Sequence, residues 1–372
     1  MLVLNHTSSI SGGERSLLDL LDGLPEQVSV VVACPSGPLA EAVRARDVEW
    51  LRIPGTEASL RLHPVWTTRA LIALARSRRR VREAVRDGGF DVVHANSLRA
   101  GLLCARMPRP PRVVFVRDVL PQRMTARVAA SVVARGPVRV LANSHFTADR
   151  FAEQTGRRAR VEVVHSPVDA RRFDPSRLTV AEARRRVGLP EQGFVAGIVG
   201  QVTPWKGHDT VVRAVAFLAR RGCDVTLAVA GSPRFAAPTT RFDNPSYLQD
   251  LHRLVDESGV ADRVHFLGER QDVDVVMRAL DVLVVPSWSE PFGRVVVEAL
   301  TMGLRVLATS QGGPREILAD DDGELLPWGD YGRWADALER EARLPPEGEE
   351  VVERRRERAV AFLARRGCDV TL

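Results

Sequence analysis

Short runs of apolar residues alternate along the chain with longer segments whose apolar positions recur every three to four residues. The runs predict buried strands, and the longer segments predict amphipathic helices. The predicted strands are residues 1–4, 28–33, 49–53, 91–94, 112–116 and 138–142, followed by 161–165, 194–200, 224–230, 263–267, 282–286 and 305–309. Predicted helices include residues 14–21, 67–86, 147–154, 208–221 and 246–258.

This alternation predicts βαβ units, in which parallel sheets carry helices on both faces. The chain of 372 residues exceeds what one hydrophobic core usually organises, so we expect two doubly wound, Rossmann-like α/β domains. The predicted domains are residues 1–168 and 169–346, followed by a helical tail at 347–372. Open α/β sheets bind ligands at the carboxyl ends of their strands, so we expect the site in a central cleft that both domains face.

The last 15 residues repeat an internal segment letter for letter: RAVAFLARRGCDVTL occurs at 213–227 and again at 358–372. Repeat architectures do not produce one identical copy amid unrelated sequence. We interpret the second copy as a gene-level event and give it little functional weight. Its strand half has no obvious sheet to join, so we expect the final residues to be poorly anchored.

Composition narrows the class of protein. Apolar residues make up 45% and charged residues 27%, as in ordinary globular domains. The sequence shows neither a membrane-spanning run nor a signal-peptide pattern, and its four cysteines are scattered. We therefore expect a cytoplasmic protein with reduced, buried cysteines.

The net charge is +6, but basic residues are spread along the chain without interleaved aromatic residues, which argues against nucleic-acid binding. The densest basic cluster lies between Arg76 and Arg86 in a predicted helix. We favour a solvated helix face there. A peripheral contact with the inner face of a membrane is the alternative.

The segment from Pro286 to Leu300 carries the strongest chemical pattern. An apolar strand ends in Pro-Ser, Glu290 lies in a short loop, and a helix begins near Gly293. Unpaired N–H groups at a helix start can meet phosphate or sugar oxygens. Glu290 and Glu298 are spaced to hold two polyol groups of one extended ligand. A helix start with acids placed to suit its dipole is the simpler alternative.

Lys206 follows another predicted strand, in the segment GQVTPWKGH, and is the only lysine beside 52 arginines. That bias is typical of genomes rich in G and C, and a lone lysine against it indicates that a compact ammonium is needed. Here it can stabilise a diphosphate leaving group. A plain turn with a surface lysine is the alternative. Gly12 and Gly13, after the first strand, let the backbone approach a phosphate closely, although paired glycines alone are weak evidence.

Together these segments resemble the family 4 retaining glycosyltransferases, which have the GT-B fold. The resemblance runs from Gly12 to about Gly323 and includes the stretches at 93–97, 142–144, 163–169, 264–268 and 312–317. It implies that Glu290 contacts the transferred sugar, Glu298 holds the ribose and Lys206 holds the diphosphate. Further donor-site positions implied by the resemblance are Gly12, Gly13, Gln201, Gly231, Phe292, Gly293 and Arg294.

Two positions depart from the family pattern. Gln201 stands where many members have an arginine, which leaves Lys206 with more of the phosphate charge. Arg117 and Asp118 stand where many members have a histidine near the reacting centre, and we assign these two to catalysis. His94 and Asn96, with Arg117, are assigned to the acceptor side.

The resemblance implies retaining transfer of a hexose-type sugar from a nucleoside-diphosphate sugar, with UDP favoured over GDP, to an acceptor hydroxyl. It implies no metal and no cofactor. The aspartates at 320–322 are interpreted as a polar turn before Gly323. Two alternatives remain open: a sugar-nucleotide epimerase or hydrolase of the same fold, and a catalytically impaired sugar-nucleotide-binding protein.

Overall fold

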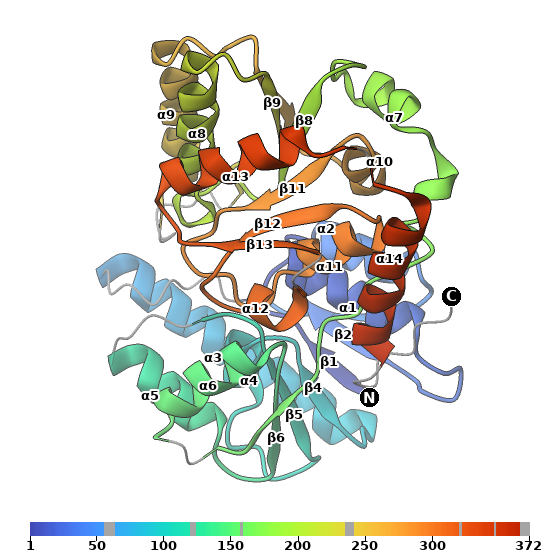
Figure 1. Cartoon of the computed structure of the whole chain (residues 1–372). Helices are drawn as coiled ribbons and strands as arrows, with labels where there is room; N and C mark the ends of the chain where they lie inside the picture. Colours follow the sequence, from blue (N-terminus) through green and yellow to red (C-terminus); the bar gives the residue numbers. More distant parts are fainter. Residues whose placement is uncertain are drawn as a thin grey trace. The chain divides into compact units, whose positions relative to one another are not determined.

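The computed structural model describes residues 1–55, 64–119, 124–156, 159–234, 242–319, 322–345 and 347–364. The chain divides into two compact units, Met1–Pro167 and Val168–Leu372. Each unit contains one parallel β-sheet with helices packed around it (Figure 1). Within the described ranges, no helix combines the length and the apolar character needed to cross a bilayer.

The first unit has a seven-stranded sheet in the order β3-β2-β1-β4-β5-β6-β7, and every pairing is parallel. Its strands are β1 (Leu2–Leu4), β2 (Val31–Cys34), β3 (Glu49–Arg52), β4 (Val93–Ala95), β5 (Arg112–Val116), β6 (Val138–Ala142) and β7 (Val161–Val163). Its helices are α1 (Gly12–Asp22), α2 (Pro38–Arg44), α3 (Pro64–Gly88), α4 (Leu98–Cys104), α5 (Met124–Val133) and α6 (His145–Gln154).

The second unit has a six-stranded parallel sheet in the order β10-β9-β8-β11-β12-β13. Its strands are β8 (Phe194–Val199), β9 (Val225–Ala230), β10 (Val264–Gly268), β11 (Val282–Val285), β12 (Arg305–Thr309) and β13 (Gly323–Leu326). Its helices are α7 (Val180–Val187), α8 (His208–Arg220), α9 (Asn244–Glu257), α10 (Val273–Arg278), α11 (Arg294–Thr301), α12 (Pro314–Ile317), α13 (Tyr331–Arg343) and α14 (Glu349–Ala364).

Both faces of each sheet are covered, as the continuous apolar strands predict. In β11, Leu283 packs into one buried cluster while its neighbours Val282 and Val284 pack into another. In β1, Leu2 and Val3 divide in the same way between two clusters. The predicted class of two Rossmann-like α/β domains is therefore confirmed.

The prediction missed β13, the edge strand of the second sheet. Its sequence, Gly-Glu-Leu-Leu, has no β-branched residue and is only four residues long. The expected polar turn before it is also wrong at Asp322, which is buried and pairs with Arg355 and Arg358. Asp320 and Asp321 lie outside the described residues.

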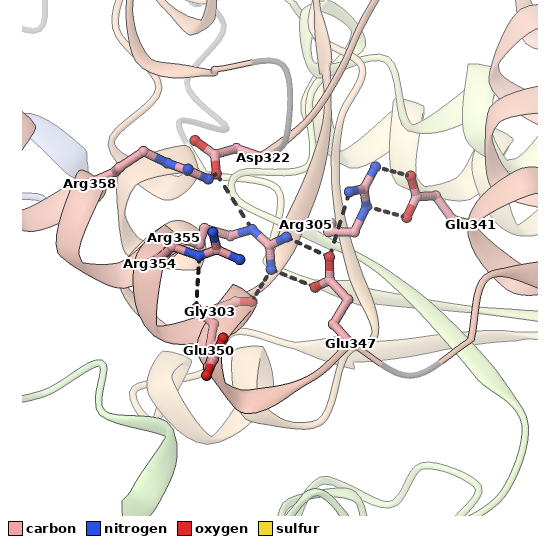
Figure 2. Close-up of polar contacts among 9 residues, drawn as sticks. All are labelled: Gly303, Arg305, Asp322, Glu341, Glu347, Glu350, Arg354, Arg355 and Arg358. Carbon is pink, nitrogen blue, oxygen red and sulfur yellow. Dashed lines mark hydrogen bonds and ion pairs between the residues drawn. The ribbon is translucent and has the colours of Figure 1, made fainter.

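Helix α14 is held to the second unit by a buried arginine (Figure 2). The guanidinium of Arg355 is fully buried, binds both carboxylate oxygens of Glu347 at 2.7 Å, and donates to the carbonyl oxygen of Gly303 at 2.8 Å. Its Nε lies 3.6 Å from Asp322, which also accepts a hydrogen bond from Arg358. Because the charges of Arg355 and Asp322 are removed from water, each depends on its partners.

The C-terminal copy of the repeated segment begins inside this helix. Ala359 and Leu363 are buried in the same apolar cluster as residues of α11, and Val360 is also buried. The described part of the copy is therefore packed into the core of the second unit, whereas its small functional weight stays a prediction. Residues 365–372, which we expected to be poorly anchored, lie outside the described residues.

Replacing Arg355 with alanine should lower the free energy of unfolding by about 3 kcal/mol, because it leaves the buried carboxylate of Asp322 with Arg358 alone and removes the bidentate partner of Glu347. Urea unfolding of the full chain measures this change. Arg354→Ala is the matched control, since Arg354 is exposed and donates only to the backbone of Glu350. Equal losses in the two variants would contradict the assignment.

Candidate functional site

The order of the second sheet reverses between β8 and β11, which are hydrogen-bonded neighbours although 82 residues lie between the end of β8 and the start of β11. Ligands of open α/β sheets bind at such a switch point, beyond the carboxyl ends of the strands. The segment after β8 contains Lys206, and the segment after β11 contains Glu290. The sheet therefore brings together two residues that are far apart in sequence.

Lys206 and Glu290 form a close, largely buried ion pair. The Nζ of Lys206 lies 2.7 Å from Oε2 of Glu290, and Ser287 Oγ donates to the same oxygen at 2.9 Å. The ammonium also lies 4.4 Å from the ring centroid of Trp205, within the range of a cation–π contact. Among the described residues, no hydrogen-bond donor reaches Oε1 of Glu290.

Backbone contacts fix the two loops that carry this pair. The N–H of Trp288 donates to the carbonyl oxygen of Trp205 at 2.8 Å, which ties one loop to the other. Gly207 has a φ of 72° and lies against the carbonyl of Pro286 so closely that a Cβ would clash. Gly312 lies equally close to the backbone of Glu290, with which it forms an isolated parallel bridge. The positions of both charges are thus set by the backbone.

The start of α11 provides the second carboxylate. Gly293 is its N-cap, and the Nε of Arg294 donates to Oε1 of Glu298 at 2.7 Å one turn later. Glu298 is 8% exposed, and Phe292 is buried in the core of the second unit. Arg294 places a cation at the positive end of the helix dipole, the less favourable orientation for such a pair.

Two other predicted donor-site residues have structural contacts in the neighbouring loops. Gln201 Nε2 donates to the carbonyl oxygen of Arg234 at 3.0 Å. Gly231 follows β9, and its N–H donates to the carbonyl oxygen of Gly268 at 2.8 Å. Both positions lie at the carboxyl end of the same sheet as Lys206.

The first sheet reverses between β1 and β4, and a polar network lies at that switch point. Asn96 follows β4 and donates to Oδ1 of Asn5 at 3.0 Å and to the carbonyl oxygen of Gly13 at 3.4 Å. Asn5 in turn donates to Glu14 at 3.2 Å, and Glu14 accepts the N–H of Ser11 at 3.1 Å. The network fixes the start of α1, which contains Gly12 and Gly13.

Arg117, predicted to be catalytic, also contacts the turn that contains Gly12 and Gly13. Its guanidinium donates to the carbonyl oxygen of Gly13 and lies 4.2 Å from the ring centroid of Phe115. Asp118, the next residue, is exposed. His94 lies inside β4, and burial, together with the charge of Arg117, lowers its pKa to about 4. His94 is therefore neutral near pH 7, and Arg117 is the cation of this group.

Two family models cover successive parts of the chain. The model for glycosyl transferases group 1 matches residues 179–358, and the model for glycosyltransferase family 4 matches residues 10–172. The chain belongs to these glycosyltransferases. The predicted family is thereby confirmed.

Curated relatives of this glycosyltransferase include D-inositol 3-phosphate glycosyltransferases. The protein of Salinispora tropica is 32% identical over 287 residues, which span 69% of this chain and 58% of that protein. The protein of Stackebrandtia nassauensis is 33% identical over 286 residues, which span 70% of this chain and 62% of that protein. The chain thus spans about three fifths of the length of these relatives.

Solved structures establish the GT-B fold of this glycosyltransferase. Anabaena HepE in complex with UDP-glucose has a TM-score of 0.78 at 24% identity, covering 98% of this chain and 94% of that one. A sucrose-phosphate synthase from Thermosynechococcus elongatus has a TM-score of 0.76 at 19% identity, covering 97% and 94%. The likeness extends over both units.

Two polar residues outside the predicted set contact predicted site residues of this glycosyltransferase, Asn5 and Ser287, and a third, Glu14, contacts Asn5. Asn5 and Ser287 could have been found, because each follows an apolar strand within two residues. Glu14 lies three residues after Ser11, and this spacing indicates the capping box that the two form. Its further bond to Asn5 depends on the sheet order, which the sequence does not show.

His208, the first residue of α8, is buried beside Lys206. Burial, and secondarily the charge of Lys206, lowers its pKa from 6.5 to about 3. The imidazole is therefore neutral near pH 7, so the positive charge here comes from Lys206. In the unfolded chain His208 would be protonated below about pH 6.5, so the stability that it contributes is lost as the pH falls from about 6.5 toward 3.

His208→Gln should therefore flatten the dependence of stability on pH by up to about 1.4 kcal/mol per pH unit between about pH 6 and 4. The measurement is urea unfolding of both proteins across this range. Above about pH 7 both proteins should show no contribution from this group, which provides an internal control. An unchanged slope in the variant would show that His208 also binds a proton in the folded state.

Proposed function

We propose that this chain is a retaining glycosyltransferase that moves a hexose-type sugar from a UDP-sugar to an acceptor hydroxyl. The observation that carries the proposal is the ion pair of Lys206 and Glu290 at the switch point of the second sheet. Family membership and the solved relative in complex with UDP-glucose support the class of donor. The named relatives make D-inositol 3-phosphate the first acceptor to test.

In this proposal Lys206 stabilises the departing nucleoside diphosphate. An ammonium has three N–H donors, and one is engaged by Glu290 in the structure. The other two can bind diphosphate oxygens as the bond from the anomeric carbon to the phosphate oxygen breaks. The acceptor oxygen then bonds to the same face of that carbon, and its proton passes to the departing phosphate. A fixed cation of this kind supplies the charge stabilisation without a metal ion.

The two carboxylates have separate roles. Oε2 of Glu290 is engaged by Lys206 and Ser287, which leaves Oε1 to accept a hydrogen bond from a hydroxyl of the transferred sugar. Glu298 accepts the ribose hydroxyls, and Arg294 holds its carboxylate in place until the donor binds. We assign the acceptor to the first unit, where Arg117 and Asn96 both donate to the carbonyl oxygen of Gly13.

Glu298→Ala should weaken UDP binding about a hundredfold, because two hydrogen bonds to a charged group are lost. Calorimetric titration with UDP, GDP and UDP-glucose measures this effect and identifies the base. Glu290→Ala is the matched comparison: the affinity for UDP should be unchanged, and only the affinity for UDP-glucose should fall. Tighter binding of GDP than UDP would overturn the choice of base, and unchanged UDP affinity in Glu298→Ala would remove the ribose contact.

Lys206→Ala should lower the turnover number for the UDP-sugar by about a hundredfold or more, as expected when a charge-stabilising group is removed. The assay is transfer to the acceptor, with the anomeric configuration of the product read by NMR. Arg213→Ala, an exposed cation on the helix that follows, is the control and should retain full activity. Near-normal turnover in Lys206→Ala would exclude Lys206 from the mechanism, and an inverted product would exclude retention.

A further inference from the structure

The first unit has a cavity of about 650 Å³ near the amino ends of β4 and β5. The polar network described above lies at the opposite, carboxyl ends of the strands. It is lined by the end of α3 and the Gly89–Phe90 turn, which precede β4, and by residues 106–111, which precede β5. Asn96 and Arg117, in contrast, follow these two strands. Since the strands are parallel, the cavity lies at their amino ends and is separate from the switch point.

The wall of this cavity is strongly positive. Arg82, Arg86, Arg106 and Arg109 line it, and none of the described residues that line it carries a carboxylate. Arg86 pairs with the exposed Asp87, whereas Arg82, Arg106 and Arg109 make no ion pair with any residue in the described ranges. Three guanidinium groups on one wall are therefore available to an anion.

Charged residues next to the cavity do not neutralise its positive wall. Arg78 donates to the carbonyl oxygen of Ala105 at 3.0 Å, and its pKa is lowered by burial and then by the charges of Arg82 and Arg106. Glu83 lies on the same helix, but its carboxylate is bound to Arg79 at 2.8 Å. A bound anion would relieve the repulsion among these arginines.

The remaining lining is apolar. It includes Phe90, the buried Met107 and three prolines between residues 108 and 111. Arg106 has a φ of 63°, a backbone conformation that residues other than glycine rarely adopt. The volume lies within the usual range for small-molecule sites, about 300–1,000 Å³. An inorganic anion would fill little of it and leave the apolar part in contact with water.

We propose that this cavity binds a phosphate monoester with an apolar group, whose phosphate the arginines hold and whose organic part contacts Phe90 and Met107. Arginine forks match the geometry of phosphate oxygens. The site is separate from sugar transfer, and the inference does not depend on the donor site. The same chemistry occurs in soluble alkyl phosphates and in the headgroup of phosphatidic acid.

Titration calorimetry of the full chain with octyl phosphate, butyl phosphate, inorganic phosphate and the neutral octyl glucoside tests the proposal. Octyl phosphate should bind tightest, because each fully buried methylene adds about fourfold in affinity. Arg82→Ala should weaken its binding about tenfold, the loss of one hydrogen bond to a charged group. Arg106→Asn should do the same, and asparagine tolerates the backbone conformation at this position.

Arg127→Ala is the matched control, because Arg127 is an exposed arginine of the same unit outside the cavity. Saturating UDP should leave octyl phosphate binding unchanged, so failure of the donor site would not affect the result. Equal binding of inorganic phosphate would mean an adventitious ion only and would overturn the proposal. Equal binding of octyl glucoside, or an equal loss in Arg127→Ala, would also overturn it.

Sedimentation with vesicles of phosphatidic acid in phosphatidylcholine distinguishes the two sources of the ligand. Capture that is lost in Arg82→Ala and Arg106→Asn would support the lipid headgroup. Octyl phosphate binding without capture by these vesicles would support a soluble phosphate monoester. Failure of both octyl phosphate and the vesicles to bind would exclude the site.

Discussion

The ion pair of Lys206 with Glu290 holds together the two loops at the switch point of the second unit. Each side chain is largely removed from water, and an isolated buried charge costs several kcal/mol. Together they satisfy one another across the neighbouring strands β8 and β11 and reinforce the backbone bond between Trp205 and Trp288. The contact that places a cation at the switch point thus also joins the loops that form it.

In both sheets the strand order reverses once, at β1 and β4 in the first and at β8 and β11 in the second. The polar groups at these two switch points differ. In the second unit a charge pair occupies this position, with another ion pair, Arg294–Glu298, at the start of α11. In the first unit, Asn5 and Asn96 hydrogen-bond to one another between β1 and β4, and Arg117 binds the nearby turn. The fold supplies equivalent positions, and the residues that occupy them give the two units different chemistry.

The alternation of apolar runs and helical segments made every strand except β13 predictable, because β-branched runs such as Val282–Val285 identify strands directly. Lys206 and Glu290 were also recognisable, since each follows such a run and the carboxyl ends of parallel strands share one edge. The contact of Arg117 with Gly13 depends on the sheet order and could not be predicted. Arg355 lies in a run of three arginines, and nothing in the sequence distinguishes it from its neighbours, although the structure buries it completely. The chemical roles of these residues stay predictions.

The repeated segment shows the same residues in two surroundings. Ala214, Val215 and Leu218 are buried in α8, and the matching Ala359, Val360 and Leu363 are buried in α14. Arg213 is exposed in α8, but its counterpart Arg358 binds Asp322. Cleavage after arginine would release the heptapeptide AVAFLAR from both places with identical mass. A mass-spectrometric footprint of that peptide would report only the average of two helices, and separating them requires an isotope label or a sequence change confined to one copy.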